Sequence, residues 1–332
     1  MVRAYGNGTE LIIDREREAK SHALLARHKL APPLLARFNN GLLYVYMDGC
    51  ACSPEDLRDP NIMRATARVL AHWHATLPTS EAVGTPLDFE NISRHLSGKP
   101  KTNLWTVMQK WITALPDQTN EERERNAKLA AEVEQATKLL GRTDGLSNGE
   151  YVLGHCDLLS GNVIILAGDL SLTEYDKSAV EVNFIDYEYA TPVPAAFDLA
   201  NHFAEWGGFD CDYNVLPTRS QRREFITEYV KSYRQHESRT VDHANGQKVT
   251  RASLQQDVDQ LMNEVDAFRG MPGLYWGIWA LIQATISQID FDYVSYAPVR
   301  LGEYYDWKAE MDGSRKQSGK EMPLRERRLI QE

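Results

Sequence analysis

The sequence predicts an α+β protein, with a small β-containing N-terminal part followed by a larger, mainly helical part. Short apolar runs typical of strands surround a single helical segment within the first 48 residues. From residue 59 onward, most apolar residues recur at helical spacing. The exception is residues 151–186, where apolar runs flank polar residues. This arrangement predicts a strand and loop unit inside the helical part.

The N-terminal part is predicted to contain three strands and one helix. Residues 2–5 form a short extended run, and residues 11–13 are predicted to be the second strand. Asp14 has the side chain of a helix N-cap, so a helix is expected over residues 15–29. Residues 42–47 follow an Asn-Asn-Gly turn signal and are predicted to form the arm of a hairpin.

The C-terminal part is predicted to be helical apart from the strand and loop unit. The helices are expected over residues 64–77, 121–140, 197–206, 221–235, 254–269 and 274–289. Strands are expected over residues 151–166 and 180–186, and a polar surface loop over residues 237–248. The expected segments are an N-terminal part, a C-terminal part and a charged, poorly ordered tail, over residues 1–48, 49–310 and 311–332.

Composition and charge argue against several classes of protein. Of the 332 residues, 42% are hydrophobic and 25% are charged, as in ordinary globular proteins. No apolar run reaches the roughly 18 residues of a membrane span. The formal net charge of −10 argues against nucleic acid or an anionic membrane as the main partner. Four cysteines are expected to be free thiols, and no signal peptide is recognised, so a cytoplasmic location is expected.

A polar motif lies within the predicted strand and loop unit. His155, Asp157 and Asn162 form the pattern H-x-D-x4-N, and Asp186 ends the next apolar run. This is the spacing of a kinase-type catalytic loop and its second metal-binding aspartate. In such a site, Asp157 accepts the proton of an attacking hydroxyl, while Asn162 and Asp186 supply oxygen ligands for Mg²⁺ beside ATP. The alternative is a hydrogen-bonded turn that only joins two strands.

Aromatic and acidic residues follow this motif. Trp276 and Trp279 are three residues apart, so they share one face of a predicted helix. Tyr189 and Glu205 follow Asp186 along the chain. Aromatic rings with a nearby carboxylate can hold an ammonium cation. Each ring also has a plainer interpretation, because a tryptophan pair at helical spacing often belongs to the hydrophobic core.

Asp198 falls in the first turn of a predicted helix. A carboxylate there either complements the helix dipole or accepts hydrogen bonds from backbone N–H groups of a neighbouring loop. We favour the second interpretation, in which Asp198 anchors the catalytic loop, and we assign His155 a similar supporting role.

Two longer stretches resemble the choline/ethanolamine kinase family. One runs from Ile185-Asp186-Tyr187-Glu188-Tyr189-Ala190 through residues 197–206, and the other is the tryptophan-containing stretch 276–284. The resemblance covers residues 2–307. It implies a protein-kinase-like two-lobe fold, with a small N-terminal β lobe and a large, mainly helical C-terminal lobe. It also implies phosphorylation of a small amino alcohol that depends on ATP and Mg²⁺.

Shorter stretches indicate a branch of that family. Residues 101–105 and 155–159 are more similar to ethanolamine kinases than to choline kinases, and residues 190–196 resemble fungal members. The resemblance therefore implies conversion of ethanolamine to phosphoethanolamine, the first step of the CDP-ethanolamine route to phosphatidylethanolamine. Choline remains a second candidate substrate. The oligomeric state is left open, with a homodimer as one arrangement.

The resemblance implies roles for individual residues. Asp157 corresponds to the catalytic base, and Asn162 and Asp186 correspond to Mg²⁺ ligands. Arg3 matches an arginine that contacts ATP phosphates, and Glu18 matches the helix glutamate that pairs with it. The adenine hinge is matched by Val45 and Met47, and the amine pocket by Tyr189, Glu205, Trp276, Trp279 and Tyr296.

The sequence departs from the family pattern in two places. The family has a Gly-rich, phosphate-covering loop before the strand of Arg3, whereas this chain begins at that strand, so a truncated N-terminal β lobe is expected. This expectation motivates a second hypothesis, a non-catalytic relative that still binds nucleotide or amine. Residues 192–196 replace a stretch that is tyrosine-rich in animal choline kinases, so one wall of the amine pocket is expected to differ.

Overall fold

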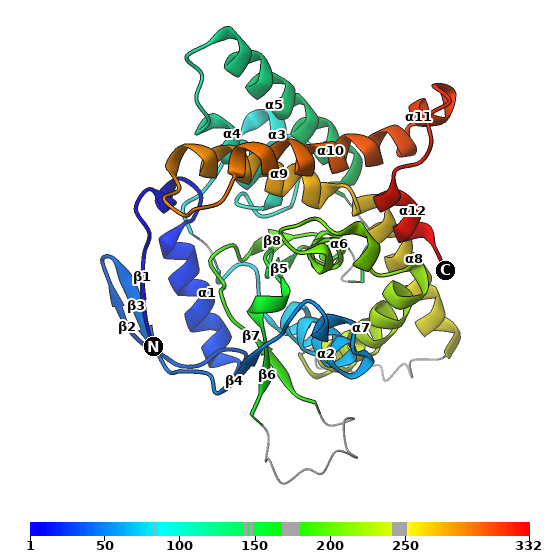
Figure 1. Cartoon of the computed structure of the whole chain (residues 1–332). Coiled ribbons are helices and arrows are strands. Elements are labelled where there is room, and N and C mark those ends of the chain that lie inside the picture. The colour runs from blue at the N-terminus through cyan, green and yellow to red at the C-terminus, as the bar shows by residue number, and fades with distance from the viewer. Residues whose placement is uncertain (83, 143–144, 147–148, 168–179, 241–250) are drawn as a thin grey trace.

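The computed structural model describes the whole chain except residues 83, 143–144, 147–148, 168–179 and 241–250 (Figure 1). Three short strands and one helix form the N-terminal part. Strands β1 (Val2–Ala4), β3 (Gly41–Tyr44) and β2 (Leu34–Phe38) make an antiparallel sheet in that order. Helix α1 (Arg15–Arg27) runs beside this sheet (Figure 1), and strands β2 and β3 form the predicted hairpin.

Helix α1 begins where its N-cap was predicted. The Asp14 carboxylate accepts hydrogen bonds from the backbone N–H groups of Glu16 and Arg17, both at 3.0 Å. The predicted strand over residues 11–13 is wrong. Thr9–Leu11 form a 3₁₀ turn instead, and the N–H groups of Ile12 and Ile13 both donate to the carbonyl of Thr9. The two isoleucines are buried in the core, so their apolar character reflects burial and not strand pairing.

The predicted strand and loop unit is present, but its strands belong to two sheets. Strand β5 (Val152–Gly154) pairs with β8 (Thr191–Val193), whereas β6 (Val163–Leu166) lies between β4 (Gly49–Ala51) and β7 (Val182–Phe184). The predicted strand over 151–166 is therefore interrupted by the loop at residues 155–162, which includes a 3₁₀ turn over Ser160–Asn162. Both ends of this loop are held by strands.

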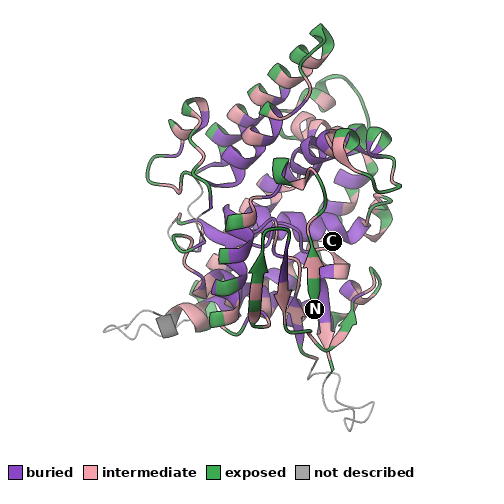
Figure 2. Cartoon of the chain, turned by 90° about the vertical axis from the view of Figure 1, so that its left-hand side faces the viewer, coloured by how far each residue is buried: buried purple, intermediate pink, exposed green. Residues whose placement is uncertain are grey.

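Helices make up most of the remaining chain. The predicted helices correspond to α2 (Pro60–Thr76), α5 (Asn120–Leu140), α6 (Ala195–Ala204), α7 (Arg219–Thr240), α8 (Arg251–Phe268) and α9 (Met271–Ile286). Helices α2 and α7 pack together on one side of β5 and β8, and α9 packs on α10 (Tyr293–Met311) on the other side (Figure 1). Figure 2 shows the buried residues gathered inside these elements. The α+β prediction with a large helical part is confirmed.

The helices that were not predicted include two long ones, α4 (Leu104–Thr113) and α10. Helix α10 contains Pro298, a residue that normally argues against a helix interior. Its position beside α9 is close because α9 presents glycine there. A Cβ atom at Gly273 would lie 2.5 Å from the carbonyl oxygen of Arg300. This close approach brings the tryptophans of α9 and the tyrosines of α10 to one region.

The end of the chain is not the poorly ordered tail that its charge suggested. After α11 (Ser314–Gln317), helix α12 (Leu324–Ile330) packs on the C-terminal part with Arg325, Glu326 and Leu329 buried. The Nε of Arg269 donates to the Glu326 carboxylate at 2.6 Å. Part of the charge of the tail is therefore paired inside the fold.

The remaining predictions are tested only in part. Helix α7 extends to Thr240, and the rest of the predicted loop at 237–248 lies outside the described residues. The short helix α3 (Glu90–Ser93), which precedes α4, lies in a stretch for which no element was predicted. In the described segments, no helix is both long enough and apolar enough to cross a lipid bilayer.

Candidate active site

The loop that carries Asp157 lies between β5 and β6 and is held by buried contacts. Cys156 adopts a left-handed conformation, with φ +65°, a geometry uncommon for residues other than glycine. The carbonyl of Cys156 accepts a hydrogen bond from the side-chain amide of Asn201 at 3.0 Å. The carbonyl of Leu158, two residues further along, accepts one from His202 at 2.8 Å. Both partners belong to α6. The backbone around Asp157 is therefore held in one conformation.

Asp198, also on α6, holds the beginning of the same loop. Its carboxylate accepts hydrogen bonds from the backbone N–H groups of His155 and Cys156 at 2.9 and 2.7 Å, and from Nε2 of His74 at 3.0 Å. Burial alone raises the pKa of Asp198. The hydrogen bond and charge of His74, together with His155, outweigh burial and bring that pKa below its ordinary value. The carboxylate therefore stays ionised and keeps accepting these hydrogen bonds.

His155 connects the Asp157 loop to the Asp186 segment. Its Nε2 donates to the carbonyl of Ile185 at 2.9 Å, so its Nδ1 is the atom that accepts from the N–H of Asp157 at 3.3 Å. Burial lowers the pKa of His155, which keeps the ring neutral. These contacts are the ones that its predicted supporting role requires.

Asp157 and Asn162 are brought together by the loop. The side-chain amide of Asn162 donates to the backbone carbonyl of Asp157 at 2.7 Å and to its carboxylate at 3.2 Å. Asp157 is only 9% exposed. Burial raises the pKa of Asp157 well above its ordinary value, and the nearby charges of Asp186 and Glu205 raise it further. A carboxylate with a raised pKa is a stronger proton acceptor when it is ionised.

Asp186 lies at the end of β7 beside this pair. The N–H of Ile185 donates to the carbonyl of Asn162 at 3.0 Å, which fixes the two backbones next to each other. Asp186 itself has φ +69°, and its side chain remains 35% exposed. An amide oxygen and an exposed carboxylate oxygen are hard ligands of the kind that Mg²⁺ prefers when phosphates and water complete its coordination. Asn162 and Asp186 therefore fit a Mg²⁺ site.

Charged side chains from the N-terminal part meet this region. Arg3 on β1 donates hydrogen bonds to the carboxylates of Asp186 and Glu188, and it lies 3.8 Å from the carboxylate of Glu18. Arg15 on α1 contacts Glu18 at 2.9 Å and Glu188 at 3.2 Å. Arg3 thus reaches its predicted partner Glu18, but its main partners are the two carboxylates after β7.

Glu188 and Arg15 received no individual role from the sequence. Burial raises the pKa of Glu188 to about 7, although the adjacent positive charge of Arg3 acts in the opposite direction. The signal for Glu188 was its position two residues after Asp186. The contact of Arg15 with Glu188 spans 173 residues, and no local pattern predicts a contact over that distance.

Val45 and Met47, the predicted adenine hinge, lie in the segment that connects β3 to β4. The N–H of Val45 donates to the carbonyl of Pro33 at 3.1 Å, and its side chain is 41% exposed. This segment joins the N-terminal part to the C-terminal part, as a hinge must. Contact of these two residues with adenine stays a prediction.

A cavity of about 540 Å³ opens beside Asp157, and all five residues predicted for the amine pocket line it. These are Tyr189, Glu205, Trp276, Trp279 and Tyr296, which come from four different elements or loops. The cavity also contains Asp186 and Glu188, so several carboxylates face one space. Aromatic walls with several carboxylates make an environment suited to a small cation.

The two tryptophans serve the core and the cavity together. Trp276 is 5% exposed and donates from Nε1 to Asn201 at 2.9 Å, whereas Trp279 is 9% exposed and donates to the hydroxyl of Tyr189 at 2.8 Å. Their rings meet edge to face, with centroids 5.3 Å apart. Most of each ring is therefore packed inside the protein, and the remaining surface faces the cavity.

Glu205 is not a free carboxylate. The buried Arg300 donates to it at 3.0 Å and to the hydroxyl of Tyr296 at 3.2 Å. Sequence reasoning also missed Asp290 and Phe291, which line the same cavity just before α10. The run of acidic and aromatic residues from 289 to 296 was a signal for this wall.

Comparisons with known proteins agree with this geometry. Residues 1–305 match the choline/ethanolamine kinase family. The chain is 34% identical to ethanolamine kinase 1 of Mus musculus over 94% of this chain and 77% of the mouse protein, and 33% identical to the Drosophila melanogaster ethanolamine kinase over 93% and 54%. The chain is also 34% identical to ethanolamine kinase 1 of Homo sapiens and covers 62% of the length of that protein.

Solved structures show the same architecture. An ethanolamine kinase from Plasmodium vivax matches with a TM-score of 0.68 and 26% identity, over 91% of this chain and 74% of that one. A choline kinase from Cryptosporidium parvum matches with a TM-score of 0.62 and 21% identity, over 94% and 82%; this second likeness concerns the fold alone. Sequence and structure together show that the chain belongs to the choline/ethanolamine kinase family.

Proposed function

We propose that this protein transfers the γ-phosphoryl group of ATP to the hydroxyl of ethanolamine, giving phosphoethanolamine and ADP. The observation that carries the proposal is the position of Asp157. Its carboxylate lies beside Asn162 and Asp186 and faces the cavity that Tyr189, Trp276 and other aromatic residues line. A general base, hard oxygen ligands and a cation-binding environment thus share one space.

The proposed chemistry follows from these neighbours. The substrate hydroxyl points at Asp157, whose carboxylate accepts its proton as the oxygen attacks the γ-phosphorus and the bond to ADP breaks. Mg²⁺ bound through Asn162 and Asp186 would neutralise charge on the phosphates. Arg3 could donate to the same phosphates if its hydrogen bond to Asp186 broke when ATP binds. The low exposure of Asp157 keeps bulk water from competing with the substrate hydroxyl.

Ethanolamine is favoured over choline by the acceptors in the cavity. A primary ammonium group has N–H donors that need oxygen partners, whereas a trimethylammonium group has none and requires only aromatic surface. Asp290 supplies a carboxylate on the cavity wall, and Glu188 and Glu205 add the oxygen lone pairs that their bonds to Arg3 and Arg300 leave over. The relatives named ethanolamine kinase support this choice. Choline is the alternative substrate, because the tryptophan rings can pack on either head group.

The test is the rate of ADP release with ATP and Mg²⁺ in the presence of ethanolamine, choline or no acceptor. We expect kcat/KM to be highest for ethanolamine. A higher value for choline would replace the substrate assignment but leave the reaction class intact. Absence of turnover with both amino alcohols, in a preparation that still binds ADP, would contradict the enzyme assignment and support a non-catalytic nucleotide-binding relative.

We also propose a cytoplasmic location, which is supported by four cysteines that are all free thiols, with Cys52 and Cys156 buried. The homodimer stays a prediction, as do the segment boundaries at residues 48–49 and 310–311.

A further inference from the structure

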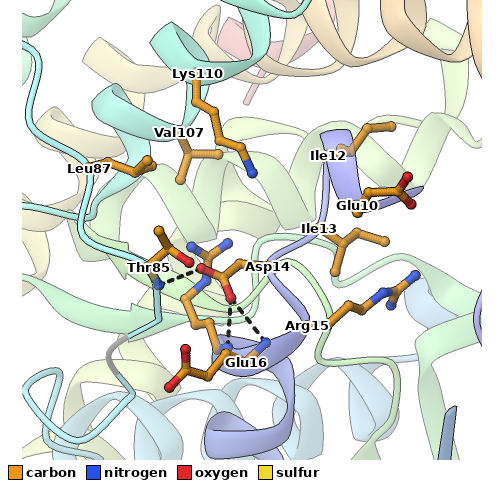
Figure 3. Close-up of a pocket in the computed structure, with 11 residues that line it drawn as sticks. Glu10, Ile12, Ile13, Asp14, Arg15, Glu16, Thr85, Leu87, Val107 and Lys110 are labelled. Atoms are coloured by element: carbon orange, nitrogen blue, oxygen red, sulfur yellow. Dashed lines mark hydrogen bonds between the residues drawn. The ribbon is translucent and has the colours of Figure 1, made fainter. Parts of the chain in front are cut away.

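A second cavity, of about 300 Å³, lies at the N-terminal end of α1 (Figure 3). It is bounded by α1, by α4 and by the segment around Thr85 and Leu87. None of its lining residues also lines the cavity beside Asp157. The proposed phosphoryl transfer therefore assigns no role to this space.

Two cations in this cavity form no salt bridge within the described residues, although the carboxylate of Asp14 is close enough to act on both. Arg17 is 4% exposed, and its Nε donates to the carbonyl of Ala190 at 3.0 Å. Within the described part of the chain, its two terminal nitrogens have no hydrogen bond or ion pair, and neither does the ammonium group of Lys110 on α4. Burial lowers the pKa of Lys110, and the positive charge of Arg17 lowers it further. The two cations are thus close enough to repel each other.

The carboxylates around the cavity are engaged elsewhere. Asp14 accepts three backbone hydrogen bonds, from Glu16 and Arg17 at 3.0 Å and from Thr85 at 2.7 Å. Glu16 pairs with Lys20 at 2.6 Å. Figure 3 shows the Lys110 amine directed into the space, whereas the carboxylate of Glu16 points away from it. Glu10 and Asp14 bring negative charge to the lining, so the positive contribution comes from the donors of Arg17 and Lys110 and from the N-terminal end of the α1 dipole.

We propose that this cavity binds a small phosphomonoester. An arginine with two free nitrogens can hold two phosphate oxygens, and a lysine adds a point charge to a third. Two separate cations suit the dianion of a phosphomonoester better than a carboxylate with a single charge. Apolar walls from Ile12, Leu87 and Val107 leave room for a short carbon body next to the phosphate.

The site is connected to the catalytic region by one hydrogen bond. Arg17 holds the carbonyl of Ala190, and Ala190 donates from its N–H to the carbonyl of Tyr187, directly after Asp186. The same helix carries Glu18, which faces Arg3. A ligand on Arg17 thus contacts the side chain that holds the segment following Asp186.

The test is calorimetric titration of the full chain with glycerol 3-phosphate, with inorganic phosphate and with glycerol. ADP and Mg²⁺ are present at saturation so that phosphate does not enter the nucleotide site. We expect glycerol 3-phosphate to bind, inorganic phosphate to bind more weakly, and glycerol not to bind. Lys110→Met should weaken glycerol 3-phosphate binding by about tenfold or more, since it removes one charged contact. Lys138→Met, on the exposed side of α5, is the matched control and should bind normally.

A second variant locates the site without changing its charge. Leu87→Trp should fill the cavity and abolish binding of glycerol 3-phosphate, while the thermal midpoint shows whether the fold is retained. The proposal is overturned if wild type does not bind glycerol 3-phosphate, if Lys110→Met binds as well as wild type, or if a folded Leu87→Trp variant binds normally. Arg17 is left unchanged in these experiments because its removal from the buried interior would perturb folding.

Discussion

Asp157 shows how the environment of one residue matches it to a proposed role. A carboxylate with 9% exposure would ordinarily be costly to ionise. Here the side-chain amide of Asn162 donates to it at 3.2 Å, which stabilises the charged form, while burial and the charges of Asp186 and Glu205 raise the pKa. The residue is therefore both oriented and made more basic than an exposed aspartate.

Replacing Asp157 with asparagine tests the base assignment. We expect Asp157→Asn to reduce kcat by about 10²–10⁴-fold, because the amide cannot accept the hydroxyl proton. The thermal midpoint should change little, since the side chains have nearly the same shape. ADP release and thermal unfolding are the two measurements. Asp210→Asn, at an exposed position, is the matched control; a near-normal rate for Asp157→Asn would refute the assignment.

Helix α6 is the element that holds the Asp157 loop. Asp198, Asn201 and His202 occupy positions i, i+3 and i+4, so they lie on one face of the helix. They bind the backbone of His155, Cys156 and Leu158 in order along the loop. The spacing of the three polar residues was visible in the sequence, although only Asp198 was recognised. The other two need the loop beside them before their role can be understood.

His202 makes the stability of this element depend on pH. Burial lowers the pKa of His202 to about 4 from an ordinary value of 6.5. The unfolded chain therefore takes up a proton at a higher pH than the folded chain, and stability is lost as pH falls below about 6.5. Between pH 7.5 and 5, His202 alone should reduce the free energy of unfolding by about 2 kcal/mol.

Urea unfolding at pH 7.5 and 5 measures this effect in wild type and in His202→Gln. The variant should be less stable at pH 7.5, because glutamine replaces a well-packed ring, but its stability should fall less on acidification. Burial also lowers the pKa values of His155 and His22, so both residues make the folded state less stable on acidification. Their effect is expected to be the same in wild type and in the variant. An equal loss of stability in both proteins would contradict the prediction.

At the scale of the whole molecule, Arg3 joins the first strand to the catalytic region. Its contacts with Asp186 and Glu188 connect residues 183 and 185 positions apart in the chain. Burial opposes the charge of Arg3, but Asp186, Glu188 and Glu18 outweigh it and raise the pKa of the guanidinium group. Charge pairing thus holds β1 beside Asp186, a proposed Mg²⁺ ligand, while apolar residues such as Leu24 and Leu25 of α1 join the N-terminal part to the main core.

Removal of this arginine should affect the nucleotide more than the amino alcohol. We expect Arg3→Met to raise KM for ATP by about tenfold or more, since a charged contact to phosphate is lost. KM for ethanolamine should change less, because Arg3 does not line the cavity beside Asp157. Steady-state kinetics with each substrate varied in turn gives both values. Arg37→Met, exposed on β2, serves as the control, and an unchanged KM for ATP would remove Arg3 from the nucleotide site.

Prediction failed where burial and long-range contacts outweigh local patterns. Residues 11–13 have the apolar character of a strand, but Leu11 ends a 3₁₀ turn and Ile12 and Ile13 are buried directly after it. Helix α10 was not predicted; it contains Pro298 and packs along α9. Charge at the C-terminus suggested disorder, whereas Glu326 is fully buried beside Arg269 and Arg325. In each case the deciding contact is tertiary packing, which no local pattern encodes.

The sequence by itself determined the type of chemistry, because the spacing of Asp157, Asn162 and Asp186 restricts which roles those side chains can take together. It also determined most helices, whose apolar periodicity is a local property. Only the tertiary structure decided which charges are available. It paired Glu205 with Arg300, whereas Arg17 and Lys110 form no salt bridge within the described residues. The reason is physical: covalent spacing defines local geometry, but pairing and desolvation depend on which distant segments pack together.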